Sequence, residues 1–195
     1  MIQIRHSQVK DCSRFWPLNT KKRVIQILES NFESIYNELI DLLAAEKKRF
    51  ENWPDQSIYA GTWEVYGLYS FGSKQQQNCE SCPITTQVVE SIDGITTAGF
   101  SALQPQTHIK PHRGYTNDVL RFHLGLIIPA SNYKDEKGAP TVQNSCGLKV
   151  NDERFIWKKG KAFAFDDRQT HEAWNMTKAT RYILLLDVLK TSLNE

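Results

Sequence analysis

The first fifty residues carry apolar side chains at helical spacing. Between residues 32 and 43 they recur every three or four positions, which predicts an amphipathic helix running toward the basic end at residues 47–49 and stopped by residues 52–55. Residues 30–33, SNFE, fit a capping box at its start. A shorter helix is expected before it, around residues 21–28.

From Trp63 onward the pattern changes to short runs typical of β-strands, six of which stand out. Helices followed by strands predict a mainly β fold, a sandwich or barrel buttressed by N-terminal helices. We expect one domain, residues 1–195, with a helical part at 1–55 and a β part at 60–190. Residues 72–91 and 130–147 are expected to be long loops, of the kind that often forms lids. The predicted strands are residues 62–69, 97–103, 120–128, 155–157, 162–165 and 182–188.

Charge and hydropathy limit the classes of binding partner that the sequence predicts. The 195 residues hold 24 basic and 22 acidic side chains, and because the two signs are interspersed no basic stripe for nucleic acid arises. The N-terminus lacks the apolar core of a signal peptide, and no apolar run approaches the ~20 residues of a membrane helix. We therefore expect a cytoplasmic protein with neither nucleic acid nor membrane as a partner.

The cysteines and glycines carry no strong motif. Only Cys79 and Cys82 of the four cysteines are close in sequence, and without a second pair they are interpreted as reduced loop thiols. The glycines form neither a phosphate-binding loop nor a dinucleotide fingerprint. Nucleotide-dependent chemistry is therefore not predicted.

Two distant segments each place a histidine in a polar turn and an arginine on a following apolar strand. His112 precedes Arg121 and His123, which alternate with apolar residues and so share one face of their strand; His171 precedes Arg181. A buried arginine needs an anionic partner, because an unpaired buried charge costs several kcal/mol. A dicarboxylate ligand would satisfy both arginines.

Two imidazoles from different strands suit Fe(II), Zn(II) or Cu(II), and ligand softness does not choose among them. A zinc hydrolase would need a third protein ligand and a carboxylate base, whereas an oxygenase using a 2-oxo acid would need a basic residue deep in the barrel. His108 is interpreted as structural, since Pro111 breaks the helix that a pair with His112 would require. Asp166 and Asp167 are interpreted as a turn-forming pair rather than as metal ligands.

Several motifs in this order resemble the aspartyl/asparaginyl β-hydroxylases, which are Fe(II)- and 2-oxoglutarate-dependent dioxygenases. The resemblance implies a double-stranded β-helix, the jelly-roll or cupin-like core, over roughly residues 63–188. The matching segments are THIKPHRG at 107–114, TN at 116–117, LRFHLGL at 120–126, FDD at 165–167, HEAW at 171–174 and Arg181.

By that resemblance His112 and His171 would bind the iron. Arg181 and Ser101 would hold the distal carboxylate of 2-oxoglutarate, while Arg121 and His123 would contact its metal-proximal end. The wider dioxygenase pattern His-x-Asp would place an aspartate at position 114, where this chain has glycine. The family looks similar in this respect, with water as the third ligand, so the loss of the anion predicts a labile metal.

The function implied is hydroxylation of an aspartyl/asparaginyl-type or other amino-acid or peptide substrate, coupled to decarboxylation of 2-oxoglutarate with O₂. The short format without a membrane helix favours such a substrate over a lipid. Two alternatives remain open: an organic-acid-binding barrel acting as a 2-oxoglutarate sensor, and a metal-dependent lyase or isomerase on the same fold.

Overall fold

The structure is a computed structural model that describes residues 18–45, 50–131, 134, 137 and 141–193. The helical elements are α1 Leu18–Ser30, α2 Phe32–Ala44, the 3-10 turn η1 Gln56–Ile58, α3 Gln76–Ser81, α4 Pro83–Glu90 and the 3-10 turn η2 Lys190–Leu193. The strands are β1 Glu51–Asn52, β2 Tyr59–Ala60, β3 Trp63–Ser70, β4 Ser73–Lys74, β5 Ile95–Leu103, β6 Thr107–His112, β7 Val119–Ile127, β8 Cys146–Val150, β9 Glu153–Phe155, β10 Ala162–Asp166, β11 His171–Asn175 and β12 Arg181–Leu189.

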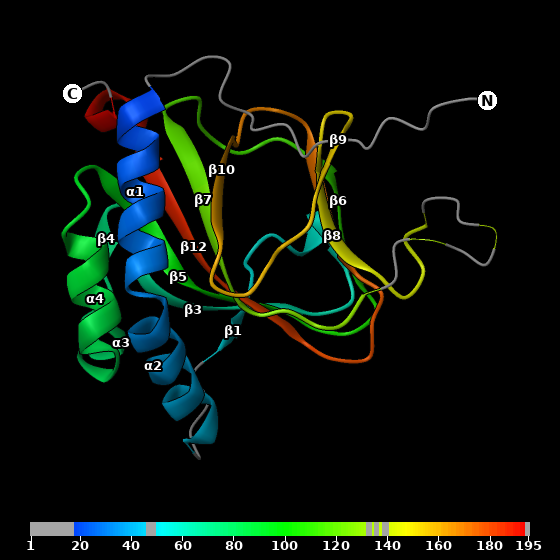
Figure 1. Ribbon diagram of the computed structural model, residues 1–195, viewed down its shortest axis with the longest axis horizontal. Helices are drawn as coiled ribbons and strands as arrows, with labels where there is room; N and C mark the ends of the chain where they lie inside the picture. Colours follow the sequence, from blue (N-terminus) through cyan, green and yellow to red (C-terminus); the bar gives the residue numbers. More distant parts are fainter. Residues whose placement is uncertain (1–17, 46–49, 132–133, 135–136, 138–140, 194–195) are drawn as a thin grey trace, which may run out of the picture.

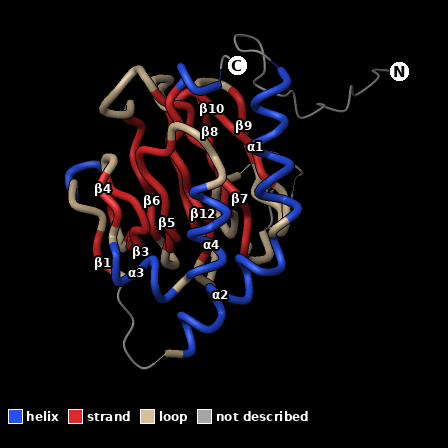
Figure 2. Tube along the Cα trace, turned by 90° about the vertical axis from the view of Figure 1, so that its left-hand side faces the viewer, coloured by secondary structure: helices blue, strands red, loops and turns tan. Residues whose placement is uncertain are grey.

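These elements form three layers (Figure 1). The larger sheet has the order β1-β3-β5-β12-β7-β10, with β4 beside β3, and the smaller sheet has the order β2-β6-β11-β8-β9. Helices α1 to α4 cover the outer face of the larger sheet, as the rotated view shows (Figure 2). The expected mainly β, jelly-roll fold with N-terminal helices is confirmed. The division of the chain into one domain with two parts stays a prediction.

Two apolar clusters hold the layers together. One lies between the helices and the larger sheet, and it includes Leu28, Ile35, Phe122 and Leu124. The second lies between the two sheets and includes Trp63, Leu148 and other apolar residues. Since β7 alternates in its pleat, its leucines and Phe122 enter the first cluster while Arg121 and His123 point between the sheets. The shared face predicted for these two residues is confirmed.

Helix α2 begins at Phe32 as predicted, but the capping box is absent. Ser30 is the last residue of α1, and Asn31 is the N-cap without a side-chain cap bond. The Asn31 side chain instead donates to the Ile27 carbonyl at 2.8 Å. The first helix thus extends almost to the start of the second. Ser30 belongs to the first helix and so cannot serve as the N-cap of the capping box. Helix α2 ends at Ala44, and the predicted basic end at 47–49 lies outside the described residues.

The prediction of a long loop at 72–91 is wrong. This segment contains β4, α3 and α4. Pro83 opens α4, and the Glu38 carboxylate of α2 accepts hydrogen bonds from the backbone N–H groups of Ile84 and Thr85, both at 2.7 Å. Because this cap comes from another helix, the local sequence does not reveal it.

The close cysteine pair lies in this helical segment rather than in a loop. Cys79 and Cys82 are buried and are free thiols, as is Cys146. The remaining strand predictions agree with the structure within a few residues, except that β9 lies at Glu153–Phe155 and overlaps the predicted 155–157 only at Phe155. In the described ranges, no helix is long and apolar enough to cross a membrane.

Candidate metal and dicarboxylate site

Two neighbouring strands of the smaller sheet bring His112 and His171 together. His112 ends β6, His171 begins β11, and the two are direct cross-strand partners. Between this pair and the pair Ile109 with Ala173, β6 carries one extra residue. A regular pleat would place Pro111 on the face of Ile109; the bulge places His112 there instead, facing the space between the sheets.

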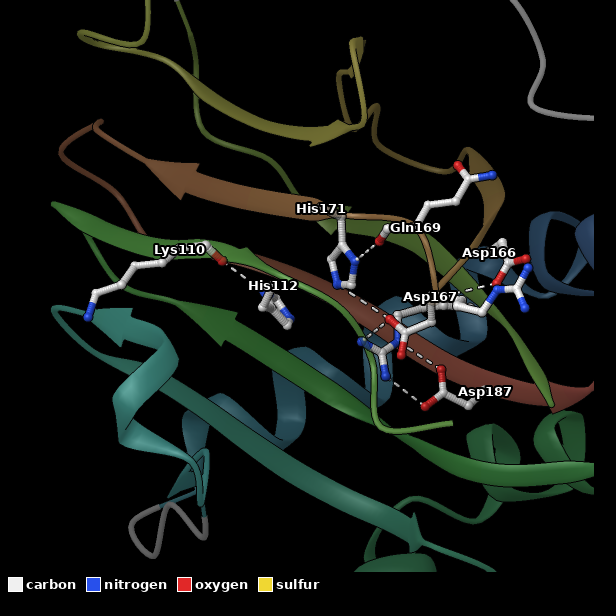
Figure 3. A network of polar contacts seen from close by, with 9 residues as sticks. Lys110, His112, Asp166, Asp167, Gln169, His171 and Asp187 are labelled. Atoms are coloured by element: carbon white, nitrogen blue, oxygen red, sulfur yellow. Dashed lines mark hydrogen bonds and ion pairs between the residues drawn. The ribbon is translucent and has the colours of Figure 1, made fainter. Parts of the chain in front are cut away.

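The two imidazoles are oriented alike by the backbone. Nδ1 of His112 donates to the Lys110 carbonyl and Nδ1 of His171 donates to the Gln169 carbonyl, each at 2.8 Å (Figure 3). This fixes the tautomer in which Nε2 carries a free lone pair, and metal-binding histidines are commonly oriented by such a bond from the other ring nitrogen. The ring centroids lie 4.2 Å apart. Burial lowers the pKa of His112 and lowers that of His171 to about 3, so both rings stay neutral.

A carboxylate from a third position lies beside this pair. Asp167 follows β10, and its Oδ1 is 3.4 Å from Nε2 of His171. A Cβ on Gly114 would lie 1.7 Å from Oδ2 of Asp167, and the Gly114 N–H donates to the Asp167 carbonyl at 2.8 Å. The aspartate therefore fills the space that any side chain at position 114 would need. Burial raises the pKa of Asp167 to about 6, against the opposing effect of Arg121.

Arg121 finds its anionic partners within the protein. Its Nε and Nη2 donate to the two carboxylate oxygens of Asp187 at 2.7 and 2.8 Å, and Nη1 lies 2.7 Å from Oδ1 of Asp167. Burial alone would lower the pKa of Arg121, but the charges of Asp187 and Asp167 outweigh it and raise the pKa. The anionic partner expected for this buried arginine is therefore present, but the protein supplies it and a dicarboxylate ligand is not needed to balance Arg121. A contact between Arg121 and a bound cofactor stays a prediction.

Deeper between the sheets, three hydrogen-bond donors line the same cavity as the histidines. Trp63 donates to Oγ of Ser101 at 3.0 Å, which leaves the serine hydroxyl proton available. Trp157 donates to Nδ1 of His123 at 3.2 Å, so Nε2 of His123 carries the proton. This buried N–H has no partner in the part of the chain that the structure describes. Burial, followed by the charges of Arg181 and Arg121, holds the pKa of His123 well below its usual value.

Arg181 is the third donor and the only one that carries charge. It is 2% exposed, its guanidinium carbon lies 4.7 Å from the Trp157 ring centroid, and its Nε has no hydrogen-bond partner among the described residues. Within the described part of the chain, no carboxylate forms an ion pair with it. Burial lowers the pKa of Arg181 to about 10, which still leaves it charged at neutral pH. An arginine, an imidazole N–H and a hydroxyl together suit a carboxylate ligand.

The cavity between these groups has a volume of about 30 Å³, room for about two water molecules. Among the residues that the structure describes, no three His, Cys, Asp or Glu side chains are arranged to hold a metal ion. The protein therefore offers a metal two imidazoles with open coordination positions, beside the Asp167 carboxylate. That donor set fits a divalent transition metal, and the deeper donors fit a carboxylate.

The structure places every predicted site residue on this cavity and brings in others that sequence analysis missed. Asp187 and Asp167 neutralise Arg121, while Trp63 and Trp157 orient the deeper donors. The sequence held one signal for Asp187. It lies six residues after Arg181 on one strand, and this even spacing places both side chains on the same face. No comparable spacing in the sequence indicated the contacts of Asp167, Trp63 and Trp157.

His108 lies outside the cavity, which agrees with a structural interpretation. Its Nε2 lies 2.9 Å from the Glu172 carboxylate, and neither residue lines the cavity. Trp174 also lies away from the cavity: it donates to the Ser145 hydroxyl at 2.8 Å and packs under Arg154.

The model of the family described as Aspartyl/Asparaginyl beta-hydroxylase matches residues 29–191, most of the chain and every residue of the site. The chain belongs to that family. The β-hydroxylase family match agrees with the resemblance found in the motifs around the two histidines. It supports an enzyme that hydroxylates its substrate.

Named relatives point to more than one substrate. The β-hydroxylase chain is 42% identical over 128 residues to the ornithine lipid ester-linked acyl 2-hydroxylase of Rhizobium tropici, covering 66% of this chain and 42% of the relative. It is 29% identical to the mouse aspartyl/asparaginyl beta-hydroxylase, covering 85% of this chain and 21% of the relative. The chain thus spans less than half the length of these two curated relatives.

A solved structure agrees with the β-hydroxylase fold. The prolyl-4-hydroxylase of Pseudomonas putida superposes with a TM-score of 0.51 at 11% identity, covering 80% of this chain and 86% of that protein. At this identity the likeness concerns the fold alone.

Proposed function

We propose that this β-hydroxylase uses Fe(II) and 2-oxoglutarate, with O₂, to hydroxylate a C–H bond of its substrate. The observation that carries the proposal is Arg181, a charged guanidinium that is buried without a carboxylate partner in the described chain and lines the cavity of His112 and His171. An uncompensated buried charge is costly, so it predicts an anion as ligand. A dicarboxylate reaching from the metal to Arg181 meets this need.

His112 and His171 would hold the iron through Nε2, since each Nδ1 is already bonded to a backbone carbonyl. Asp167, whose Oδ1 lies 3.4 Å from Nε2 of His171 and pairs with Arg121, would accept a hydrogen bond from a water near the iron. When bound, iron with 2-oxoglutarate and O₂ supplies the oxidant: 2-oxoglutarate, O₂ and R–H give succinate, CO₂ and R–OH. The residues around it position the reactants and limit the access of water.

Arg181, Ser101 and His123 would bind the 2-oxoglutarate carboxylates. Arg181 and the Ser101 hydroxyl suit the distal carboxylate, and the Nε2–H of His123 suits the end near the metal, where Arg121 also lies. A five-carbon diacid is larger than the 30 Å³ cavity, so its binding requires the lining side chains to move apart. Trp157 borders both His123 and Arg181, which makes it the first side chain expected to shift.

Two substrate classes follow from the relatives. The first is an aspartyl/asparaginyl-type residue or another amino-acid or peptide substrate, as the family description suggests. The second is a lipid-linked acyl chain, favoured by the 42% identity to an enzyme named for acyl 2-hydroxylation. That identity weighs against the earlier preference for a non-lipid substrate.

The first experiment adds Fe(II) and 2-oxoglutarate to metal-free protein under anaerobic conditions and records the visible metal-to-ligand charge-transfer band. His171→Ala is expected to remove the band because it removes one of two ligands. Arg181→Met is expected to weaken 2-oxoglutarate binding by roughly 10²-fold or more, since truncating one partner of a buried charge pair costs about 3–5 kcal/mol. His108→Ala and Arg154→Met are the matched controls, because both lie outside the cavity.

An unchanged band in His171→Ala, or equal loss in the controls, would contradict the site assignment. Succinate release that rises with an added peptide or lipid would identify the substrate class. A band without substrate-dependent succinate would favour the sensor, and turnover without O₂ consumption would favour a lyase or isomerase.

A further inference from the structure

A second cavity, of about 280 Å³, adjoins the site. Thr97 and Val65 line it from β5 and β3, on the same faces that present Ser101 and Trp63 to the deeper cavity. Thr97 is also the cross-strand partner of Asp187, the residue that binds Arg121. We call this second cavity the substrate cleft. It continues the inner face of the larger sheet from the site toward β3 and the edge strand β1.

Aromatic rings connect and border the substrate cleft. Trp53 lines it and stacks on Trp63 of the deeper cavity, with ring centroids 4.4 Å apart and ring planes 13° apart. Phe71 and Tyr115 also line it, and they are 76% and 67% exposed. Exposed aromatic side chains on the wall of a cavity are suited to contact a ligand, because burying them releases ordered water and adds ring contacts.

The charge of the substrate cleft is negative. Glu51 and Asp55 line it, and no lysine, arginine or histidine is among the described residues that do. The Ser57 hydroxyl donates to one Asp55 oxygen at 2.5 Å and the Tyr115 hydroxyl to the other at 2.9 Å. These bonds, the Ser57 one first, lower the pKa of Asp55 and keep it ionised. Lys110 lies nearby but donates to the Ser57 carbonyl and does not line the cleft.

The floor of the substrate cleft is kept open by a glycine. Gly67 of β3 lines it, and its cross-strand partner on β5 is Gly99. A Cβ added at Gly67 would lie 3.3 Å from the Ser70 hydroxyl and 3.9 Å from Cγ of Gln75. A larger side chain at position 67 would therefore extend into the cleft without meeting backbone.

We infer that the substrate cleft binds an ammonium group of the substrate, between the carboxylates of Glu51 and Asp55 and the rings of Trp53 and Tyr115. The inference rests on the proposed function, because it assigns the part of the substrate that lies beyond the carbon to be hydroxylated. Two carboxylates attract a cation, and aromatic faces add cation–π contact. Among the described residues that line the cleft, an anionic group would meet only like charges. The substrate is thus an amine-bearing molecule.

The test uses three probes that share one phenylethyl scaffold: phenethylammonium, neutral 2-phenylethanol and anionic 3-phenylpropanoate. Each is titrated into the full-length, metal-free protein while the indole N–H resonance of Trp53, assigned with Trp53→Phe, is followed. Phenethylammonium is expected to bind tightest and 3-phenylpropanoate weakest. Glu51→Gln and Asp55→Asn should each weaken the amine by roughly threefold, and together by about tenfold, the range for partly exposed ion pairs.

Two further variants separate charge from shape. Asp55→Asn keeps an oxygen for the Ser57 bonds, and Asp152→Asn, in the exposed turn between β8 and β9, is its matched control with no expected effect. Gly67→Leu should abolish the Trp53 shift by filling the cleft. The inference is overturned if the three probes bind with equal affinity. It is also overturned if the affinity for phenethylammonium is unchanged in both the double variant and Gly67→Leu.

The same protein samples are titrated with Fe(II) and 2-oxoglutarate under anaerobic conditions. The charge-transfer band is expected to persist in the cleft variants, since none of the substituted residues lines the deeper cavity and Asp55 acts on His112 through its charge. A band without amine binding would reject the cleft assignment alone. Amine binding at Trp53 without a band in the wild-type protein would reject the proposed function and leave the cleft as an amine-binding site.

Discussion

The Asp167 carboxylate occupies the space that a side chain at position 114 would need, which explains the glycine there. A Cβ there would overlap the Asp167 carboxylate, so Gly114→Asp is expected to displace Asp167 rather than add a metal ligand. We expect a loss of about 1–3 kcal/mol in the free energy of unfolding, as for overpacked cores, and no gain in Fe(II) affinity. Urea unfolding and Fe(II) titration measure both effects.

Gly114→Ala separates the steric effect from the charge and should lose similar stability. Removing Asp167 in the same chain frees the space, so Gly114→Asp with Asp167→Ala should be more stable than Gly114→Asp alone. Tighter Fe(II) binding by Gly114→Asp with unchanged stability would show that Asp167 does not occupy this space.

Asp187 is expected to be the most costly acidic residue to neutralise. It accepts two hydrogen bonds from Arg121, and both side chains are almost fully buried. Asp187→Asn leaves the arginine with weaker compensation, so we expect a loss of about 3 kcal/mol in the free energy of unfolding. Asp152→Asn, which is exposed, should change it by less than about 0.5 kcal/mol. A loss for Asp187→Asn that matches the control would mean that water replaces the pair.

Sequence reasoning at this scale succeeds where strand periodicity applies and fails where contacts cross the fold. The shared face of Arg121 and His123 follows from a pleat of period two, and the structure agrees. Strand periodicity did not predict the partners of Arg121, because Asp167 and Asp187 approach it from a turn and from another strand. A buried arginine predicts an anionic partner, but the sequence pattern does not indicate whether the protein or a ligand supplies that anion.

At the scale of elements, α4 depends on a cap from a different helix. Its eight residues begin with Pro83, and the Glu38 carboxylate accepts two of its free backbone N–H groups. Glu38→Gln keeps only one acceptor oxygen and loses the charge that favours a helix N-terminus, so a loss of about 1 kcal/mol in stability is expected. Denaturant unfolding measures it, with the exposed Glu80→Gln as control. An equal effect of both substitutions would show that the cap adds nothing.

The same contact explains the failure to predict α4. Threonine and valine in residues 83–90 favour strands locally, and the helix forms because its buried side chains and its cap meet α2. Helix α2 was predictable because its own apolar stripe, Phe32 to Leu42, is long and regular. The bulge in β6 that turns His112 inward has no comparable signal, since periodicity alone would select Pro111.

For the whole molecule, packing of the helical layer makes Cys82 a reporter of unfolding. The thiol is fully buried, and burial, followed by the charge of Glu38, raises its pKa from 9.0 to about 12. It should therefore resist a thiol reagent at pH 8 until the protein unfolds. Because the unfolded chain releases this proton first, the contribution to stability is present below pH 9 and decreases as pH rises from there toward 12.

Labelling with an aromatic disulfide reagent at increasing urea concentrations measures this directly. The labelling of Cys82, located by mass spectrometry, should follow the global unfolding curve. Rapid labelling of Cys82 without denaturant would show that α3 and α4 open independently of the sheets.

The cross-strand pairing of His112 with His171 has a consequence for how the chain comes apart. The two residues are far apart in sequence but adjacent in the smaller sheet, so a metal bound by both would tie β6 to β11 and close the intervening chain into a loop. A cellular unfoldase pulling on the C-terminus would first have to break the pairing of β12 with β5 and β7, and it would then meet that tie. The lifetime of the protein under such pulling would then depend on whether that metal is bound.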